Sequence, residues 1–171
     1  MTNTPSFHPT ASKIVSREDA ATKVSEWRAE GRTIAYTNGC FDIIHAGHVQ
    51  TLEDARRQGD VLIVGLNSDN SARRLKGPGR PVFSERERAE MVAALSAVDL
   101  VVIFPEDSSL PLIEALKPDV WVKGGDYVID TVNQEERAFV ESYGGRVALG
   151  RKVEGSSTTD VIARVKSLPD S

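Results

Sequence analysis

The hydrophobic and polar positions along the chain follow two spacings, one typical of buried strands and one typical of amphipathic helices. Continuous apolar runs, of which VLIVGL at residues 61–66 is the clearest, predict strands buried on both faces. Apolar residues at helical spacing, such as Val49, Leu52 and Ala55, predict helices that bury one side. We predict strands at residues 33–36, 61–66, 100–104, 120–122 and 146–149. We predict helices at residues 16–30, 48–58, 84–97, 110–116, 134–143 and 158–166.

The order of these elements predicts the fold class. Strands that alternate with helices imply crossover connections, which give a parallel sheet with helices on both faces. We therefore expect a Rossmann-like, doubly wound α/β fold with a five-stranded, mainly parallel sheet. The length of 171 residues fits one domain. We predict a disordered N-terminal lead at residues 1–15 and a single domain at residues 16–171.

Composition and charge exclude several classes of protein. The formal net charge of −4 gives no overall basic field, so we expect neither nucleic acid nor a membrane as a partner. No apolar run approaches the ~20 residues of a membrane span, and the N-terminus has no apolar segment typical of a secretory signal. The single cysteine, Cys40, excludes an internal disulfide and fits a reducing compartment. We therefore predict a cytoplasmic protein that holds any anionic substrate with local groups.

The turn after the first predicted strand, TNGCFDIIHAGH at residues 37–48, contains two of the three histidines. His45 and His48 lie three residues apart where a helix is expected to begin. The backbone N–H groups and the dipole at a helix start favour an anion, and imidazoles add hydrogen bonds to phosphate oxygens. The alternative is a helix-capping histidine and a surface histidine. That alternative does not explain why both histidines occur at one helix start, directly after a turn that contains glycine.

The loop after the second predicted strand, NSDNSARRLKGPGRPV at residues 67–82, is rich in cations. Arg73, Arg74, Lys76 and Arg80 fall within eight positions, and two glycines and two prolines interrupt the helix. Such a loop can place cations over a triphosphate, and we favour Lys76 and Arg80 for this role. The alternative is a solvated surface loop, as for most charge runs.

Two later strand ends also suit a nucleotide. In KGGDY at residues 123–127, two glycines allow close approach of the backbone, Asp126 can accept hydrogen bonds from ribose, and Tyr127 can pack against a ring. A plain β-turn is the alternative. In GSSTT at residues 155–159, four hydroxyls open a helix where one would suffice as a cap. We therefore expect phosphate contacts there as well.

Taken in order, these segments resemble a known family. The HxGH spacing at residues 45–48, preceded by NGCFD, is similar to the signature of the nucleotidyltransferase superfamily. The further series NSD, RLKG, KGGDY and STT closely resembles the branch that transfers AMP from ATP to D-glycero-β-D-manno-heptose 1-phosphate. The resemblance covers residues 33–166 and implies an enzyme that forms ADP-heptose and pyrophosphate. The chain contains no kinase half and so resembles the stand-alone form of these adenylyltransferases.

The resemblance also implies roles for individual residues. The expected catalytic residues are His45, His48 and Lys76. The expected nucleotide contacts are Thr37, Asn38, Gly39, Cys40, Phe41, His45, His48, Lys76, Lys123, Gly124, Asp126, Tyr127, Ser157, Thr158 and Thr159. The expected substrate-binding residues are Asp42, Arg80 and Arg88, although Arg88 could instead pair with Glu85 at the surface or pass under the ligand site. No residue is expected to bind a metal directly, because Mg²⁺ would be held through the phosphates of ATP. A homodimer is possible.

Other functions are compatible with parts of the pattern. A cytidylyltransferase that acts on glycerol 3-phosphate or a similar small phosphate shares HxGH but typically carries RTxGISTT. Here the matching stretch is VEGSSTT, without the arginine. A nucleotide-binding regulatory module without catalysis, or an adenylyltransferase for a cofactor precursor such as a flavin, are further alternatives. The intact histidine pair and Lys76 argue against the regulatory module.

Overall fold

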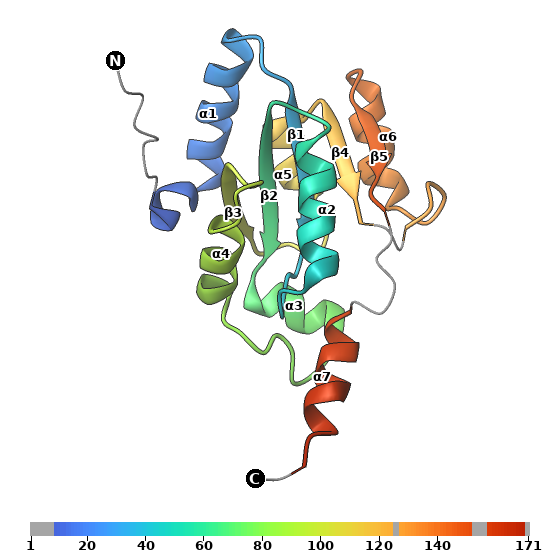
Figure 1. Cartoon of the computed structure of the whole chain (residues 1–171). Coiled ribbons are helices and arrows are strands. Elements are labelled where there is room, and N and C mark those ends of the chain that lie inside the picture. Colours follow the sequence, from blue (N-terminus) through green and yellow to red (C-terminus); the bar gives the residue numbers. More distant parts are fainter. Residues whose placement is uncertain (1–8, 125–126, 152–156, 170–171) are drawn as a thin grey trace.

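The computed structural model describes residues 9–124, 127–151 and 157–169. Five strands form one sheet: β1 (Ile34–Gly39), β2 (Val61–Asn67), β3 (Leu100–Phe104), β4 (Val120–Lys123) and β5 (Arg146–Leu149). The helices are α1 (Arg17–Ala29), α2 (Ala46–Arg56), α3 (Asp69–Lys76), α4 (Glu85–Ala93), α5 (Leu110–Leu116), α6 (Gln134–Ser142) and α7 (Thr158–Lys166), with a 3₁₀ turn η1 at Thr10–Lys13 (Figure 1). The strand order is β3-β2-β1-β4-β5, and every pairing is parallel. The predicted Rossmann-like, doubly wound α/β class is confirmed.

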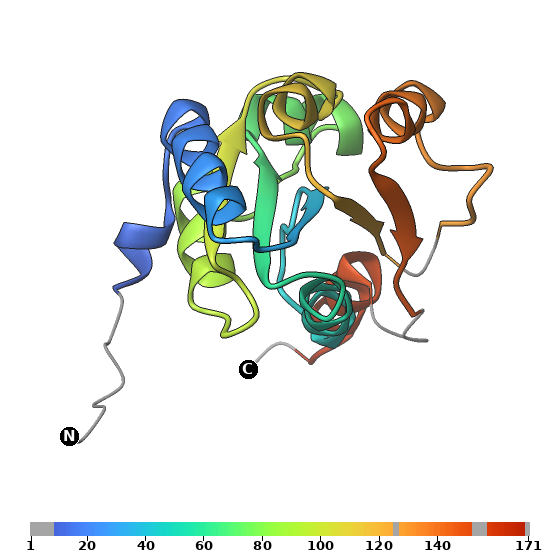
Figure 2. The ribbon, with the colours of Figure 1, turned by 90° about the horizontal axis from the view of Figure 1, so that it is seen from above.

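Helices cover both faces of the sheet (Figure 2). On one face, α1, α5 and α6 bury residues such as Trp27, Ile113 and Val140. On the other face, α2 and α4 bury residues such as Leu52 and Val92. Complete burial of a large aliphatic side chain stabilises the fold by about 1.5–3 kcal/mol. The all-buried pattern of β2 explains why its sequence is continuously apolar rather than alternating.

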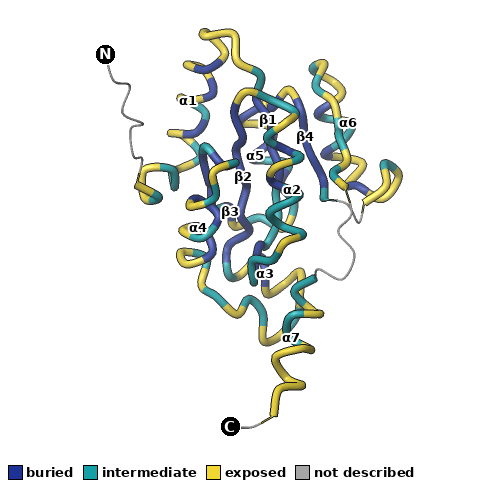
Figure 3. Tube along the Cα trace, viewed as in Figure 1, coloured by how far each residue is buried: buried dark blue, intermediate teal, exposed yellow. Residues whose placement is uncertain are grey.

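The topology places a crevice at the carboxyl edge of the sheet. From the central strand β1, the chain adds β2 and β3 on one side, and later β4 and β5 on the other. The connections that leave β1 and β4 therefore run in different directions, and this is where ligands bind in open α/β sheets. Helix α3 lies below this edge, and α7 extends from it (Figure 1). Strands β1 to β4 are mostly buried, whereas the edge strand β5 and most of α7 are not (Figure 3).

The segment after β2 differs from its prediction. The sequence predicts a loop at residues 67–82, but α3 occupies Asp69–Lys76. The Ser68 hydroxyl caps this helix by accepting a hydrogen bond from the Ser71 amide, and Gly77, with φ of 94°, ends it. The glycines and prolines therefore terminate the helix instead of preventing it. The helix predicted at residues 84–97 is also shorter than expected, since α4 ends at Ala93.

The N-terminal lead also differs in part from its prediction. Residues 1–8 lie outside the described residues. From residue 10 on, η1 is followed by Ile14, which bridges to Val101 of β3, and the Lys13 amine donates to the Val98 carbonyl at 2.8 Å. Residues 10–15 therefore pack against the domain instead of forming a disordered lead.

Candidate active site at the carboxyl edge of the sheet

A cavity of about 810 Å³ opens at the carboxyl ends of the strands. Its volume lies within the range typical of small-molecule sites. The cavity brings together most of the predicted site residues, namely Thr37, Asn38, Gly39, Cys40, Phe41, Asp42, His45, His48, Lys76, Arg80, Lys123, Gly124, Tyr127, Ser157, Thr158 and Thr159. Asp126 lies outside the described residues, and Arg88 does not line the cavity. Segments far apart in the sequence thus meet at one place.

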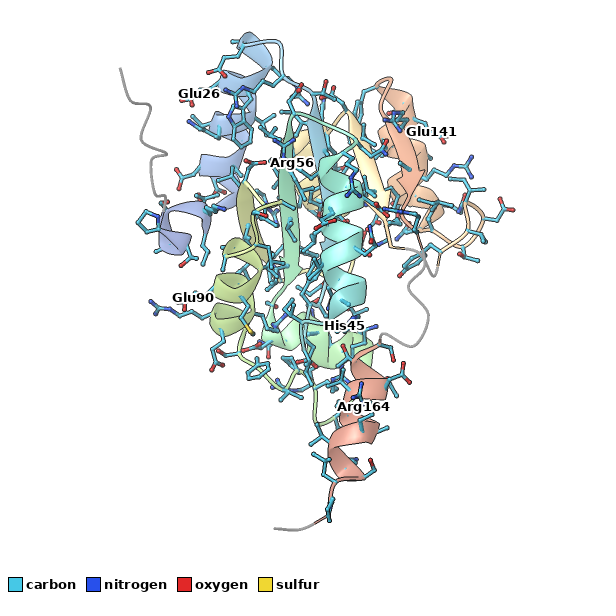
Figure 4. The ribbon with its side chains drawn as sticks, viewed as in Figure 1. Glu26, His45, Arg56, Glu90, Glu141 and Arg164 are labelled. Atoms are coloured by element: carbon cyan, nitrogen blue, oxygen red, sulfur yellow. The ribbon has the colours of Figure 1, made fainter. Side chains whose placement is uncertain are left out.

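The two histidines form a stacked pair at the start of α2. Their ring centroids lie 3.8 Å apart with an interplanar angle of 27°, and Phe41 packs against His48. His45 is the N-cap of α2, because its Nδ1 accepts a hydrogen bond from the Gly47 amide at 3.1 Å. A neutral His45 therefore carries its proton on Nε2 and keeps that donor for a ligand. Figure 4 shows His45 at the end of α2 that lies nearest α3 and α7.

His48 is partly buried, in contrast to the surface histidine of the alternative interpretation. Its Nδ1 is buried without a hydrogen-bond partner among the described residues. Burial, followed by the proximity of His45, lowers the pKa of His48 to about 4. At neutral pH the ring is therefore uncharged in the absence of ligand.

The lowered pKa of His48 predicts a pH dependence of stability. In the unfolded chain this ring takes up a proton near pH 6.5, whereas in the folded chain it does so near pH 4. Between these values the unfolded state binds more protons, so stability present above about pH 6.5 falls as the pH drops toward 4. Urea unfolding at several pH values should show this loss in the parent and a smaller loss in His48→Ala. An NMR titration that places the pKa of His48 near 6.5 would contradict the prediction.

Asp42 and Arg80 contact each other at the cavity wall. The Asp42 side chain is 3% exposed and accepts hydrogen bonds from Arg80 Nε at 2.5 Å and from the Val82 amide at 2.7 Å. The carboxylate therefore anchors the segment that follows α3 against the histidine turn. The sequence predicts substrate binding for both residues. Both line the cavity, but the Arg80 side chain is 20% exposed whereas that of Asp42 is 3% exposed.

Arg88 lies beneath the site and is fully buried. Its guanidinium donates to the Phe83 carbonyl at 3.0 Å, the Cys40 carbonyl at 2.5 Å and Asp69 Oδ1 at 2.8 Å. The sequence left open whether Arg88 pairs with Glu85 at the surface or lies under the ligand site. The structure has the second arrangement, and Arg88 pairs with Asp69, not with Glu85, among the described residues. The predicted substrate contact does not fit this geometry, because all three guanidinium nitrogens already have protein partners.

Lys123 at the end of β4 is buried beside two aromatic rings. Its amine donates to Asn38 Oδ1 at 3.3 Å and lies 5.3 Å from the centroid of Trp121 and 4.7 Å from that of Tyr127. Burial lowers the pKa of Lys123. Lys76, at the last position of α3, lines the same cavity. The cavity thus contains two lysines, one from the end of β4 and one from the end of α3.

The start of α7 completes the cavity. Ser157 is its N-cap and accepts a hydrogen bond from the Asp160 amide at 3.0 Å, so the capping alternative holds for this hydroxyl. Arg151, which follows β5, donates to Asp54 of α2 through its amide at 3.0 Å and its guanidinium at 2.8 Å. The Arg151 side chain lowers the pKa of Asp54 to about 2.

Several cavity residues were missed by the sequence predictions. They are Gly47, Thr51, Asn67, Leu75, Asp107, Thr131, Asn133, Glu136 and Arg151. Asn67 is the last residue of β2, and Asp107 and Arg151 follow β3 and β5 closely, a signal that could have identified all three. Glu136 lies within α6, where no local pattern separates it from an ordinary acidic residue of a first helical turn.

Among residues 9–124, 127–151 and 157–169, no three His, Cys, Asp or Glu side chains are grouped so that they could hold a metal ion. Within the same ranges, no helix is long and apolar enough to cross a membrane.

Comparisons with known proteins define the family of the chain. The cytidylyltransferase-like family model matches residues 36–164. The chain therefore belongs to the cytidylyltransferase-like family of nucleotidyltransferases, and the predicted superfamily is confirmed.

Individual relatives agree with this family. The chain is 54% identical over 154 residues to the bifunctional protein HldE of Syntrophotalea carbinolica, covering 90% of this chain and 31% of the relative. It is 53% identical over 164 residues to the bifunctional protein HldE of Mesorhizobium japonicum, covering 95% of this chain and 33% of the relative. The chain thus spans about a third of the length of these relatives. A lipopolysaccharide core biosynthesis protein from Thermoplasma volcanium has a similar structure, with a TM-score of 0.63 and 25% identity over 72% of this chain and 100% of that one.

Proposed function

We propose that the chain transfers AMP from ATP to D-glycero-β-D-manno-heptose 1-phosphate and thereby forms ADP-heptose and pyrophosphate. The observation that carries this proposal is the stacked His45–His48 pair at the start of α2, in the same cavity as Lys76 and the hydroxyls of α7. The choice of ATP and heptose rests on the motif resemblance and on the names of the HldE relatives. We place the reaction in the cytoplasm, consistent with the single cysteine.

In the proposed reaction, an oxygen of the acceptor phosphate attacks the α-phosphorus of ATP. The new bond joins that oxygen to the α-phosphorus, and the bond from the α-phosphorus to the oxygen that bridges to the β-phosphorus breaks. The electron pair leaves with pyrophosphate. The acceptor is already an anion near neutral pH, so the reaction needs no general base. Catalysis then depends on positioning two anions and stabilising their charge.

The cavity residues fit these requirements. His45 offers its Nε2 proton as a donor, since its Nδ1 is used by the Gly47 amide. His48 lies directly against His45 and provides a second imidazole for the α-phosphate. Lys76 provides a positive charge at the end of α3. We propose that these three residues stabilise the charge that develops during transfer.

We further propose that Mg²⁺ accompanies the nucleotide. When bound, it would neutralise part of the phosphate charge, and it would need few protein ligands. Residues near the phosphates therefore have to orient the nucleotide and neutralise the phosphate charge that Mg²⁺ does not neutralise.

The proposal is tested by a pyrophosphate-release screen. The four nucleoside triphosphates are combined with both anomers of the heptose 1-phosphate and with glycerol 3-phosphate. We expect turnover with ATP and the β-anomer. Turnover with CTP and glycerol 3-phosphate would instead identify a glycerol-phosphate cytidylyltransferase. Binding of ATP without pyrophosphate release from any pair would identify a regulatory module.

A further inference from the structure

One wall of the cavity has a chemistry that does not suit phosphates. We call it the polar wall and define it as Asn67, Asp107, Thr131, Asn133 and Glu136, all of which line the cavity. These residues come from the ends of β2 and β3 and from the start of α6. Helix α6 lies on the face of the sheet opposite to α2, which carries the histidine pair (Figure 2). The α6 part of the polar wall, with Asn133 and Glu136, therefore lies on the side of the sheet opposite to the histidine pair.

The polar wall consists of two carboxylates, two amides and one hydroxyl. A carboxylate repels a phosphate but accepts hydrogen bonds from hydroxyl groups. Asp107 is already paired with Arg74, whose Nε donates to it at 2.8 Å. Glu136 is thus the carboxylate of this wall that is not used by an arginine among the described residues. The wall suits a ligand that carries many hydroxyls and disfavours a triphosphate.

Glu136 is held rigidly in this wall. The residue is 3% exposed, and its Oε1 accepts hydrogen bonds from the Ser108 hydroxyl at 2.9 Å, the Ser109 amide at 2.7 Å and the Ser109 hydroxyl at 3.1 Å. Three donors at the start of α5 therefore fix the carboxylate. The second oxygen, Oε2, is the acceptor that this arrangement leaves for a ligand.

Asn133 is fixed beside Glu136 by the cap of α6. Its Oδ1 accepts hydrogen bonds from the Glu135 amide at 3.0 Å and the Glu136 amide at 3.2 Å. Because the amide oxygen is used, the Nδ2 group remains as a donor. An oriented acceptor on Glu136 and an oriented donor on Asn133 form a complementary pair for neighbouring hydroxyls, each of which both donates and accepts.

We propose that Glu136 and Asn133 form the subsite that binds the hydroxyls of the acceptor sugar, an inference that rests on the proposed function. The sugar ring lies against the polar wall while its phosphate points toward the histidine turn. Buried polar groups that pair with substrate hydroxyls reject analogues that lack them, because the protein groups then remain unpaired. The subsite therefore selects a polyhydroxylated sugar phosphate over a short alditol phosphate.

Glu136→Gln tests this inference with little change in structure. Glutamine keeps an oxygen for the three donors at Ser108 and Ser109 and replaces Oε2 by an NH₂ group. The matched control is Glu135→Gln, which removes the same charge from the exposed neighbouring position. KM is measured for heptose 1-phosphate and for ATP in the parent and both variants. Calorimetry gives the affinity of each protein for heptose 1-phosphate alone.

We expect Glu136→Gln to weaken sugar phosphate binding about 10- to 100-fold, the range for a lost hydrogen bond to a charged group. Its KM for ATP should stay within about twofold of the parent, and Glu135→Gln should match the parent. Asn133→Asp keeps the capping oxygen but removes the Nδ2 donor. It should therefore weaken sugar phosphate binding in the same way.

The outcomes separate this inference from the proposed function. Unchanged sugar phosphate affinity in Glu136→Gln, or an equal rise in both KM values, would overturn the inference while parent turnover upholds the function. A parent that binds the sugar phosphate but releases no pyrophosphate would overturn the function, and the calorimetric comparison would still decide the subsite. A parent that shows neither binding nor turnover would overturn both.

Discussion

Replacement of His48 by alanine is expected to lower kcat by roughly 10²–10³, the usual cost of losing one group that stabilises transition-state charge. The ring lies 3.8 Å from His45 at the start of α2, inside the cavity that contains Lys76. The fold should be retained, because the buried Nδ1 of His48 makes no hydrogen bond with the described residues that would be broken. Steady-state pyrophosphate release measures the effect.

The kinetic constants of His48→Ala show whether the residue acts in substrate binding or in the transition state. If His48 acts mainly in the transition state, kcat and kcat/KM should fall together, with little change in KM. Glu53→Ala, an exposed substitution on the same helix, is the control and should behave as the parent. Activity of His48→Ala within threefold of the parent would contradict the catalytic role.

Replacement of Arg88 by methionine is expected to lower the free energy of unfolding by about 2–4 kcal/mol. The substitution removes the donors for two partly buried carbonyls, those of Cys40 and Phe83, and breaks the pair with Asp69. Asp69 is partly exposed, so water can solvate its carboxylate once Arg88 is removed. This solvation reduces the loss of stability toward the lower end of the range. Urea unfolding followed by circular dichroism gives the difference.

The neighbouring arginine provides a matched control. The Arg86 side chain is 87% exposed and approaches only Glu90, at 3.6 Å, among the described residues. Arg86→Met should therefore change stability by less than about 0.5 kcal/mol. Arg88→Met is also expected to reduce turnover, because Arg88 joins the turn at Cys40 to the first residue of α3, which ends at Lys76. Equal stability of the two variants would contradict this account.

The sheet was predictable because parallel strands leave a strong signal in the sequence. Strands β2 and β3 are covered on both faces, so nearly every position is apolar. Helix α3 was missed because only Ser71 and Ala72 are buried, and its exposed, cationic remainder is typical of a loop. The hydroxyl of Ser68 caps α3, and this helix start precedes the glycines and prolines, which end the helix.

Much of the candidate site was predictable for a topological reason. Carboxyl ends of parallel strands meet at one edge, so residues that follow strands, such as His45 and Lys123, gather there. The sequence does not predict whether each of these side chains contacts a ligand or another part of the protein. Arg88 and Asp42 have the chemistry of substrate ligands, but the fold uses them to join its own segments. Glu136 lines the cavity from within α6, where Ser108 and Ser109 hold its carboxylate by contacts between residues far apart in the sequence.

The most direct test of the central claim is the fate of an oxygen label. Heptose 1-phosphate labelled with ¹⁸O in its phosphate is incubated with ATP and the full chain, and the products are analysed by mass spectrometry. Attack by this phosphate on the α-phosphorus of ATP predicts that all the label appears in ADP-heptose and none in pyrophosphate. Label in a sugar 1-diphosphate or a sugar bisphosphate together with free ADP would show attack on the γ-phosphorus, by the phosphate or by a hydroxyl, and would contradict nucleotidyl transfer.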